Sequence, residues 1–205
     1  MLTLYGAKGS GSAAIEAALT IAGLPFRSVP AATWEPGPGL EELKRVNPLA
    51  QIPTLVLEDG SVMTESAGIL IWLGLRHPKS GLLPAEPAQA IRGLVFIAAN
   101  CYAAIGIIDY PERFCADCDE PTAERIRAAT KARLHQYWDM FADQFGSHMN
   151  PKQPGALDLL AAVVSRWSGA RAHLKEQRPA FHAMLEKIEA DPRIAEIFRR
   201  HWPPN

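Results

Sequence analysis

The chain has 205 residues, with 22 acidic and 21 basic side chains and a formal net charge of −1 at pH 7. This balance, without runs of like charge, excludes the electrostatic footprint of a protein that binds nucleic acid or an anionic membrane. Hydrophobic residues make up 48% of the sequence, an ordinary value that excludes a disordered or fibrous chain. Function is therefore expected in a pocket.

The N-terminus and the cysteine count indicate a cytoplasmic protein. The opening MLTLYGAKGS has neither the basic start nor the apolar run of a signal peptide, and no window approaches 18 uninterrupted apolar residues. The three cysteines are an odd number, so no disulfide framework is expected. We expect reduced thiols, a cytoplasmic location and no membrane partner.

The start of the chain alternates between strand and helix patterns. Residues 2–5 predict a short strand, and the loop GAKGSGS separates it from a helix that ends at Gly23. Residues 26–30 predict a second strand. Prolines and glycines then limit the helix within residues 33–48 to a short one.

A hairpin and a third helix complete this first half. TLVL (54–57) and SVMT (61–64) predict antiparallel strands, because the Asp59-Gly60 pair between them favours a tight turn. Ser66 is expected to cap a helix with apolar residues at helical spacing. The predicted order is βαβαββα.

The second half has helical patterns alone. Residues 77–87 carry three prolines and predict a linker. Apolar residues then repeat at helical spacing in the segments 91–105, 122–146, 156–168, 180–190 and 192–201. The sequence therefore predicts an α/β domain over residues 1–76 and an all-α domain over residues 88–205.

Two short motifs in the first half are suited to binding a peptide. In QIP, a cis bond before Pro53 would turn the chain and free the Ile52 backbone to pair with an extended ligand. The alternative is a plain strand-entry proline. In ES, a helix start offers free N–H groups and the Ser66 hydroxyl to a carboxylate, while Glu65 offers its charge to an ammonium. Taken alone, the pair is better explained by an ordinary helix cap with an acidic residue before it.

In combination the motifs are specific. The stretch NPLAQIPTLVLEDGSVMTESAGILIWL (47–73) resembles the glutathione-binding half of the glutathione S-transferase family. The resemblance implies a thioredoxin-like N-terminal domain, a linker, an all-helical domain and a homodimer. It also implies that Ile52 pairs with the cysteinyl backbone of glutathione, while Glu65 and Ser66, assisted by Gln51, hold the γ-glutamyl group. Glutathione would be a co-substrate, and no other cofactor and no metal are expected.

The catalytic residue is open from the sequence. Members of the family hold the glutathione thiolate with a Tyr, Ser or Cys after the first strand, and the loop YGAKGSGSA contains no cysteine. Ser10 and Ser12 precede the predicted helix and are the candidates, with Tyr5 as a third. Ser12 could instead be a helix cap, and Tyr5 could pack the strand. Serine-type members often carry an Arg near this helix start, where this chain has AAI, so an electrostatic helper is expected to be missing.

The second half supplies further expectations. GALDLLAAVV (155–164) looks like the family's buried helix start, with Asp158 at the acidic position and Gly155 in place of Ser or Thr, which weakens the reciprocal cap. Asn100 and Tyr102 are candidate binding residues. Tyr102 would form the acceptor-pocket wall with Ile105 and Ile108, although such a stripe is more often plain core.

The pair Cys115 and Cys118 forms a C-x-x-C in the helical half. This spacing occurs in redox dithiols and in zinc sites, but a redox dithiol of a thioredoxin fold follows the first strand, and zinc would need two more ligands. Surface-loop cysteines are the simpler interpretation.

These observations favour a cytoplasmic glutathione transferase that adds the glutathione thiolate to a small apolar electrophile. The rival hypothesis is a glutathione-binding regulator or carrier without transferase activity. A third is glutathione-dependent peroxide reduction or isomerisation.

Overall fold

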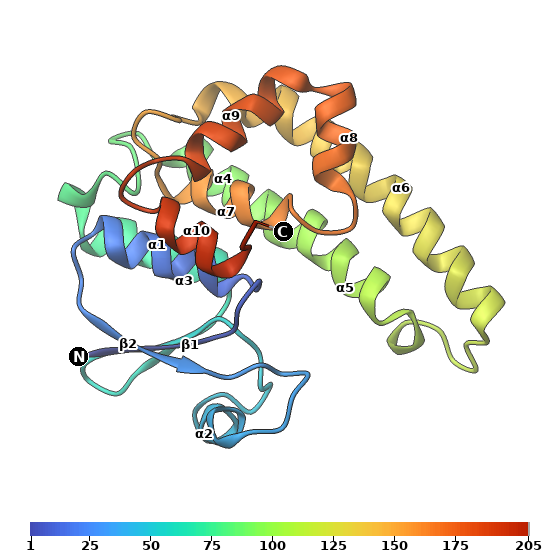
Figure 1. Ribbon diagram of the computed structural model, residues 1–205, viewed down its shortest axis with the longest axis horizontal. Helices are drawn as coiled ribbons and strands as arrows, with labels where there is room; N and C mark the ends of the chain where they lie inside the picture. Colours follow the sequence, from blue (N-terminus) through green and yellow to red (C-terminus); the bar gives the residue numbers. More distant parts are fainter. Residues whose placement is uncertain (205) are drawn as a thin grey trace.

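A computed structural model describes residues 1–204, which form a small sheet with its helices and a larger helical array (Figure 1). The sheet has the order β2-β1-β3-β4, with β1 parallel to β2 and antiparallel to β3, and β3 antiparallel to β4. Its strands are β1 (Leu2–Gly6), β2 (Phe26–Pro30), β3 (Thr54–Val56) and β4 (Val62–Met63). The predicted hairpin at Asp59-Gly60 is confirmed.

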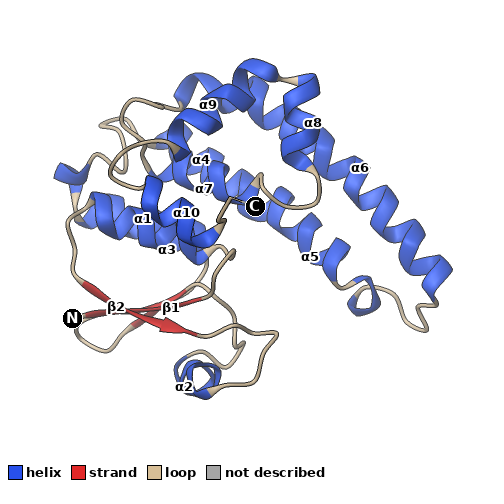
Figure 2. Cartoon of the chain, in the orientation of Figure 1, coloured by secondary structure: helices blue, strands red, loops and turns tan. Residues whose placement is uncertain are grey.

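Helices cover both faces of this sheet. Figure 2 shows α1 (Ser12–Ile21) and α3 (Ser66–Arg76) on one face and α2 (Pro38–Val46) on the other. The helices on the two faces differ in composition. Helix α1 is apolar nearly all round and lies between the sheet and the helical array. Helix α2 is amphipathic and buries Leu43 against the outer face of the sheet. A thioredoxin-like N-terminal domain followed by a helical domain is therefore the fold.

The helical array begins after a 3-10 turn at Pro78–Ser80. Its core is continuous with that of the first domain, because α1 and α3 pack on α7 and α1 also packs on α10. The helices are α4 (Ala88–Phe96), α5 (Ala103–Asp109), α6 (Glu120–Phe145), α7 (Ala156–Val164), α8 (Ala170–Gln177), α9 (Pro179–Glu189) and α10 (Ala195–His201). Short turns lie at Pro111–Arg113 and Gly146–His148.

One helical stretch is interrupted by a different winding. Residues Ile97–Tyr102 form a π-helical segment between α4 and α5, so that Ala88–Asp109 runs as one continuous helix. By length and composition alone this helix could cross a membrane, with a mean hydropathy of 1.8 in its most apolar window. The helix packs on α6 and α7. Core helices of soluble proteins meet the same criteria of length and apolar composition.

The structure corrects several local predictions. Helix α8 was not predicted, because only Ala170 and Leu174 on it are buried and its other side chains, apart from Ala172, are polar or charged, which leaves too weak a period. The helix expected over 156–168 ends at Val164. Ser66 is the first residue of α3 rather than its cap, since Glu65 holds the N-cap position and no side chain caps the helix.

The contacts at the start of α7 explain why the chain has Gly155 where a Ser or Thr was expected. The Asp158 carboxylate accepts the Gly155 N–H at 2.9 Å and the Asn150 N–H at 2.7 Å, so one half of the reciprocal cap is present and the missing hydroxyl is the other half. Burial raises the pKa of Asp158 to about 6. A Cβ at Gly155 would lie 2.8 Å from the Leu82 carbonyl oxygen, which accepts the Ala156 N–H. The glycine is required by this close approach.

Candidate functional site

A cavity of about 690 Å³ lies between the thioredoxin-like domain and the helix formed by α4, the π segment and α5. This volume suits a small-molecule site. Most of the residues predicted to bind come together there. The lining consists of Gly9, Ser10, Gly11, Thr33, Trp34, Gln51, Ile52, Pro53, Thr64, Glu65, Ser66, Ala98, Tyr102, Ala103, Ile105, Gly106, Asp109, Tyr110, Trp167 and Ser168.

The turn before β3 is built around a buried amide. The Ile52–Pro53 bond is cis, as expected from the sequence. The Asn47 side chain donates to the Gln51 carbonyl at 3.2 Å and to the Thr54 hydroxyl at 2.9 Å, and Thr54 in turn donates to the Gln51 carbonyl at 2.7 Å. This network holds the backbone of Ile52 at the cavity wall.

The start of α3 presents two polar side chains that lack partners. Glu65 has φ 61°, a left-handed backbone conformation that is costly for a residue with a Cβ and that is found at functional sites. Neither the Glu65 carboxylate nor the Ser66 hydroxyl makes a hydrogen bond or an ion pair within residues 1–204. An exposed anion beside a buried hydroxyl and free helix N–H groups can accept a ligand that carries both an ammonium and a carboxylate.

The loop after β1 separates the two candidate serines. Ser10 lines the cavity, but its Oγ lies 2.8 Å from the Ala7 carbonyl oxygen, to which it donates, and 2.8 Å from Ser12 Oγ. Ser12 is buried behind the loop and outside the cavity lining, where its hydroxyl contacts both polar groups of the Ala7 peptide. Gly11 occupies the N-cap position of α1, so Ser12 is not the helix cap.

Tyr5 lies away from the cavity. Its ring is 3% exposed in the small core between the sheet and α2, and its hydroxyl donates to Glu42 Oε1 at 2.7 Å. Burial and this bond raise the pKa of Tyr5. The strand-packing interpretation of Tyr5 fits this position.

The opposite wall comes from the long helix. Tyr102 and Ile105 line the cavity, and the Tyr102 ring meets Trp167 edge-on with centroids 5.6 Å apart. Ile108 packs on the main core and is outside the lining. Asn100 is also outside it, because its amide donates to the Phe96 carbonyl at 3.1 Å within the π segment. The structure therefore separates Asn100 from the other candidate binding residues.

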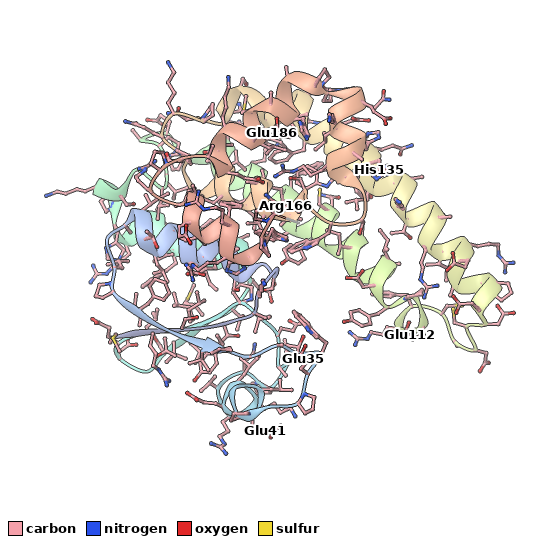
Figure 3. All side chains as sticks on the ribbon, in the orientation of Figure 1. Glu35, Glu41, Glu112, His135, Arg166 and Glu186 are labelled. Atoms are coloured by element: carbon pink, nitrogen blue, oxygen red, sulfur yellow. The ribbon has the colours of Figure 1, made fainter. Side chains whose placement is uncertain are left out.

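The cavity contains acids but no bases among residues 1–204. Glu65 and Asp109 line it, whereas no Lys, Arg or His does, and burial raises the pKa of Asp109. Figure 3 shows Glu35 on the segment between β2 and α2 and Glu112 on the turn after α5; Glu35 directly follows Trp34, and Glu112 lies two positions after Tyr110, both of which line the cavity. An anionic ligand must therefore be stabilised by helix N-termini and hydroxyl groups rather than by cationic side chains.

The C-terminal helix fixes the loop that carries Ser10. The Gly9 N–H donates to His201 Nδ1 at 3.1 Å, so Nδ1 is unprotonated and Nε2–H donates to Glu16 Oε2 at 2.9 Å. Arg200 pairs with the same carboxylate. Burial alone would raise the pKa of Glu16, but the bonds from His201 and Arg200 outweigh it and keep that pKa below its usual value. The loop is thus held between β1 and α10.

The C-x-x-C lies in the loop before α6. Cys115 and Cys118 are half-buried, and Asp117 between them has φ 52°. Desolvation and the neighbouring Cys115 thiol raise the pKa of Cys118, which opposes the thiolate character of a redox cysteine. Among residues 1–204 no group of three or more His, Cys, Asp or Glu is placed to hold a metal ion.

Comparison with known proteins shows what the chain is similar to. Residues 12–76, which include the turn before β3 and the start of α3, match the family model of the glutathione S-transferase N-terminal domain. In this segment the chain resembles the glutathione S-transferases. Over 98% of both chains it is 28% identical to YncG of Escherichia coli strain K12, described as an uncharacterized glutathione S-transferase-like protein.

Two solved structures agree over nearly the whole chain. A glutathione transferase from Methylococcus capsulatus is 25% identical over 98% of both chains, with a TM-score of 0.75. A glutathione transferase homolog from Sulfitobacter, solved with bound glutathione, is 23% identical over 96% of both chains, with a TM-score of 0.76. The chain therefore shares the two-domain fold of these two structures.

Several residues that line or support the cavity were not found from the sequence. Trp34 comes from the segment before α2, and Trp167 and Ser168 come from the turn after α7. His201 acts from the far end of the chain. No periodic pattern points to such residues, because each lies at the end of an element or in a loop and only the packing of the two domains brings it to the cavity.

Proposed function

We propose that this protein binds glutathione in the cavity and transfers it, as a thiolate, to an electrophilic carbon of an apolar substrate. The observation that carries the proposal is one continuous cavity with peptide-binding groups at Ile52, Glu65 and Ser66 and an aromatic wall at Tyr102 and Trp167. A nucleophile and an apolar acceptor can meet within such a space.

Glutathione recognition would use groups that lack protein partners. Glu65 would face the γ-glutamyl ammonium, and Ser66 with the first N–H groups of α3 would face the adjoining carboxylate, with Gln51 beside them. The Ile52 backbone would pair with the cysteinyl unit as a partial extra strand. The Sulfitobacter relative with bound glutathione supports this ligand.

The tripeptide in this orientation would direct its sulfur towards the start of α1. The loop there brings Ser10 and the backbone of Gly11 to the cavity, and the positive end of the helix dipole favours an anion. The thiolate would attack the acceptor carbon, forming a C–S bond while the leaving group departs with the electrons of the bond that breaks. An aryl halide would release halide ion in this way.

The acceptor would lie against the long helix. Ala98, Ala103 and Gly106 leave room there, and Trp34, which is 57% exposed, and Tyr110 provide aromatic surface at the open end. This lining suits a small hydrophobic electrophile. We also propose, from the family, that the protein is a cytoplasmic homodimer.

One observation favours the rival function, a glutathione carrier or regulator without transferase activity. Among residues 1–204 no cationic side chain lines the cavity, and the hydroxyl proton of Ser10 is already donated to Ala7, so thiolate formation depends on few donors. A protein that only carries glutathione would need the Glu65 and Ser66 groups alone.

Two measurements on the purified protein separate the hypotheses. Titration calorimetry measures glutathione binding, and turnover of a generic aryl halide with glutathione measures transfer. Binding with turnover well above the uncatalysed rate supports a transferase, and binding without turnover of any electrophile supports the carrier. Product analysis with a hydroperoxide and with an isomerisable substrate tests the third hypothesis, glutathione-dependent peroxide reduction or isomerisation. Absence of glutathione binding would refute all three hypotheses.

A further inference from the structure

The hydroxyl of Tyr102 lies at the start of α1, although its residue belongs to the other domain. A Cβ placed on Gly11 would lie only 2.1 Å from Tyr102 Oη and 3.6 Å from the Cδ atom of Pro53. The hydroxyl, the N-terminal end of α1 and the turn that carries Ile52 therefore converge on one point of the cavity. This is where a cysteinyl sulfur would lie if the peptide pairs with Ile52.

This hydroxyl has no hydrogen-bond partner within residues 1–204, even though the side chain lines the cavity and is largely enclosed. The Tyr102 ring is held edge-on by Trp167, so the hydroxyl is fixed rather than free to turn away. Enclosed polar groups in folded proteins are nearly always paired. A fixed and unpaired donor that faces a cavity is therefore available to a ligand.

The backbone at Tyr102 is also unusual. Tyr102 is the last residue of the π segment Ile97–Tyr102, which interrupts an otherwise α-helical stretch. Such segments are rare, occur mainly inside α-helices and are frequent at functional sites. The wider turn of a π segment changes the direction in which the side chain at its end, here Tyr102, points compared with a continuous α-helix.

Ser10 is a weaker donor by comparison. A serine hydroxyl has one proton, and that of Ser10 is directed to the Ala7 carbonyl oxygen at 2.8 Å, with Ser12 Oγ at the same distance. The N–H groups of Ala7 and Ser12, each at 3.3 Å, occupy its acceptor side. To donate to a ligand, Ser10 would have to give up its bond within the loop.

Protonation of Tyr102 suits a donor. Burial, and then the negative charge of Glu65, raises the pKa of Tyr102 above its usual value. The phenol therefore keeps its proton throughout the neutral range. Because no Lys, Arg or His of the described part of the chain lines the cavity, a neutral hydroxyl of this kind is the group best placed to stabilise an anion beside Gly11.

We propose that the Tyr102 hydroxyl, rather than that of Ser10, is the principal side-chain donor to the glutathione thiolate. This assignment rests on the proposed function. Glutathione transfers its thiol proton to solvent, and the remaining sulfur anion accepts the Tyr102 O–H. Ser10 then serves to shape the loop through its bond to Ala7.

The test is the pKa of the glutathione thiol when it is bound, followed by the thiolate absorbance in a pH titration. Tyr102→Phe removes only the hydroxyl, and we expect that pKa to rise by about one to two units, the effect of losing one bond to an ionised group. Ser10→Ala should shift it by less. Tyr137→Phe is the matched control, because Tyr137 lies on α6 outside the cavity lining. Thermal unfolding of each variant checks its fold.

S-methylglutathione distinguishes the failure of this inference from the failure of the proposed function, because its thioether cannot ionise. The parent and Tyr102→Phe should bind it equally, within about twofold. If the parent binds neither compound, the proposed function is wrong and the inference is wrong with it. If the parent binds glutathione and Tyr102→Phe leaves the thiol pKa unchanged, or Ser10→Ala shifts it as much, only the assignment to Tyr102 is overturned.

Discussion

The carboxylate of Glu65 gives the most direct test of how the cavity selects its ligand. Glu65→Gln keeps the shape of the side chain and the backbone at φ 61° but removes the charge. Within residues 1–204 the Glu65 carboxylate has no ion-pair partner, and no Lys, Arg or His lines the cavity, so nothing in the protein competes with a ligand ammonium for it. The substitution should therefore weaken glutathione binding while leaving the fold intact.

The size of the effect follows from the exposure of the side chain. A hydrogen bond to a charged group contributes about 1.5 to 3 kcal/mol, and solvent reduces the contribution of an exposed group towards the lower end. Glu65 is exposed. We expect a loss of about 1.5 to 2 kcal/mol, which corresponds to about ten- to thirtyfold weaker binding.

Titration calorimetry with two ligands identifies the partner of this carboxylate. The parent and Glu65→Gln are each titrated with glutathione and with its desamino analogue, which lacks only the α-ammonium. If Glu65 pairs with the ammonium, the substitution weakens glutathione binding but barely changes binding of the analogue, because the interaction has already been removed. Glu86→Gln, the same change at an exposed site outside the cavity lining, is the control. An equal loss for both ligands, or no loss for glutathione, would refute the reasoning.

Three further predictions concern the scaffold around the cavity. His201→Phe removes the acceptor of the partly buried Gly9 N–H in the loop before α1 and should lower the free energy of unfolding by about 1 to 3 kcal/mol in urea denaturation. His201→Asn should retain part of this stability, and equal stability of the parent and the Phe variant would contradict the prediction. Gly155→Ala places a Cβ about 2.8 Å from the Leu82 carbonyl oxygen and should cost about 1 to 3 kcal/mol in the same assay, an outcome contradicted by an unchanged midpoint. Replacing both Cys115 and Cys118 by Ser should preserve turnover and metal content, so loss of most activity, or stoichiometric zinc in the parent, would show that the loop has a function.

Local motifs made the turn before β3, the hairpin and the start of α3 largely predictable from the sequence. The Gln51-Ile52-Pro53 turn, the Asp59-Gly60 hairpin and the Glu65-Ser66 helix start each depend on residues within a few positions of one another. The structure has the turn and the hairpin as the sequence predicted them, and α3 begins at the predicted place, although Glu65 rather than Ser66 holds the N-cap position. Short-range rules work there because proline, glycine and a helix start restrict the backbone locally.

The side chains that reach the cavity near the start of α1 could not be predicted in the same way. Ser10, Ser12 and Tyr5 all follow from the sequence as candidates, and only their hydrogen bonds to Ala7 and Glu42 separate them. Likewise Asn100 and Tyr102 are two positions apart on one helix, yet the π segment and the packing of the domains bring only Tyr102 to the cavity.

The sequence by itself determined the two-domain fold class, the turn at Ile52-Pro53 and the place where α3 begins, because hydrophobic period and turn chemistry act over short distances along the chain. The tertiary structure decided which side chains meet at the start of α1. The contact of Tyr102 with Gly11 and the bond from Gly9 to His201 join residues far apart in the chain, and the latter spans 192 positions. Such contacts arise from how the helical array packs on the sheet, and no periodic pattern within a single element encodes them.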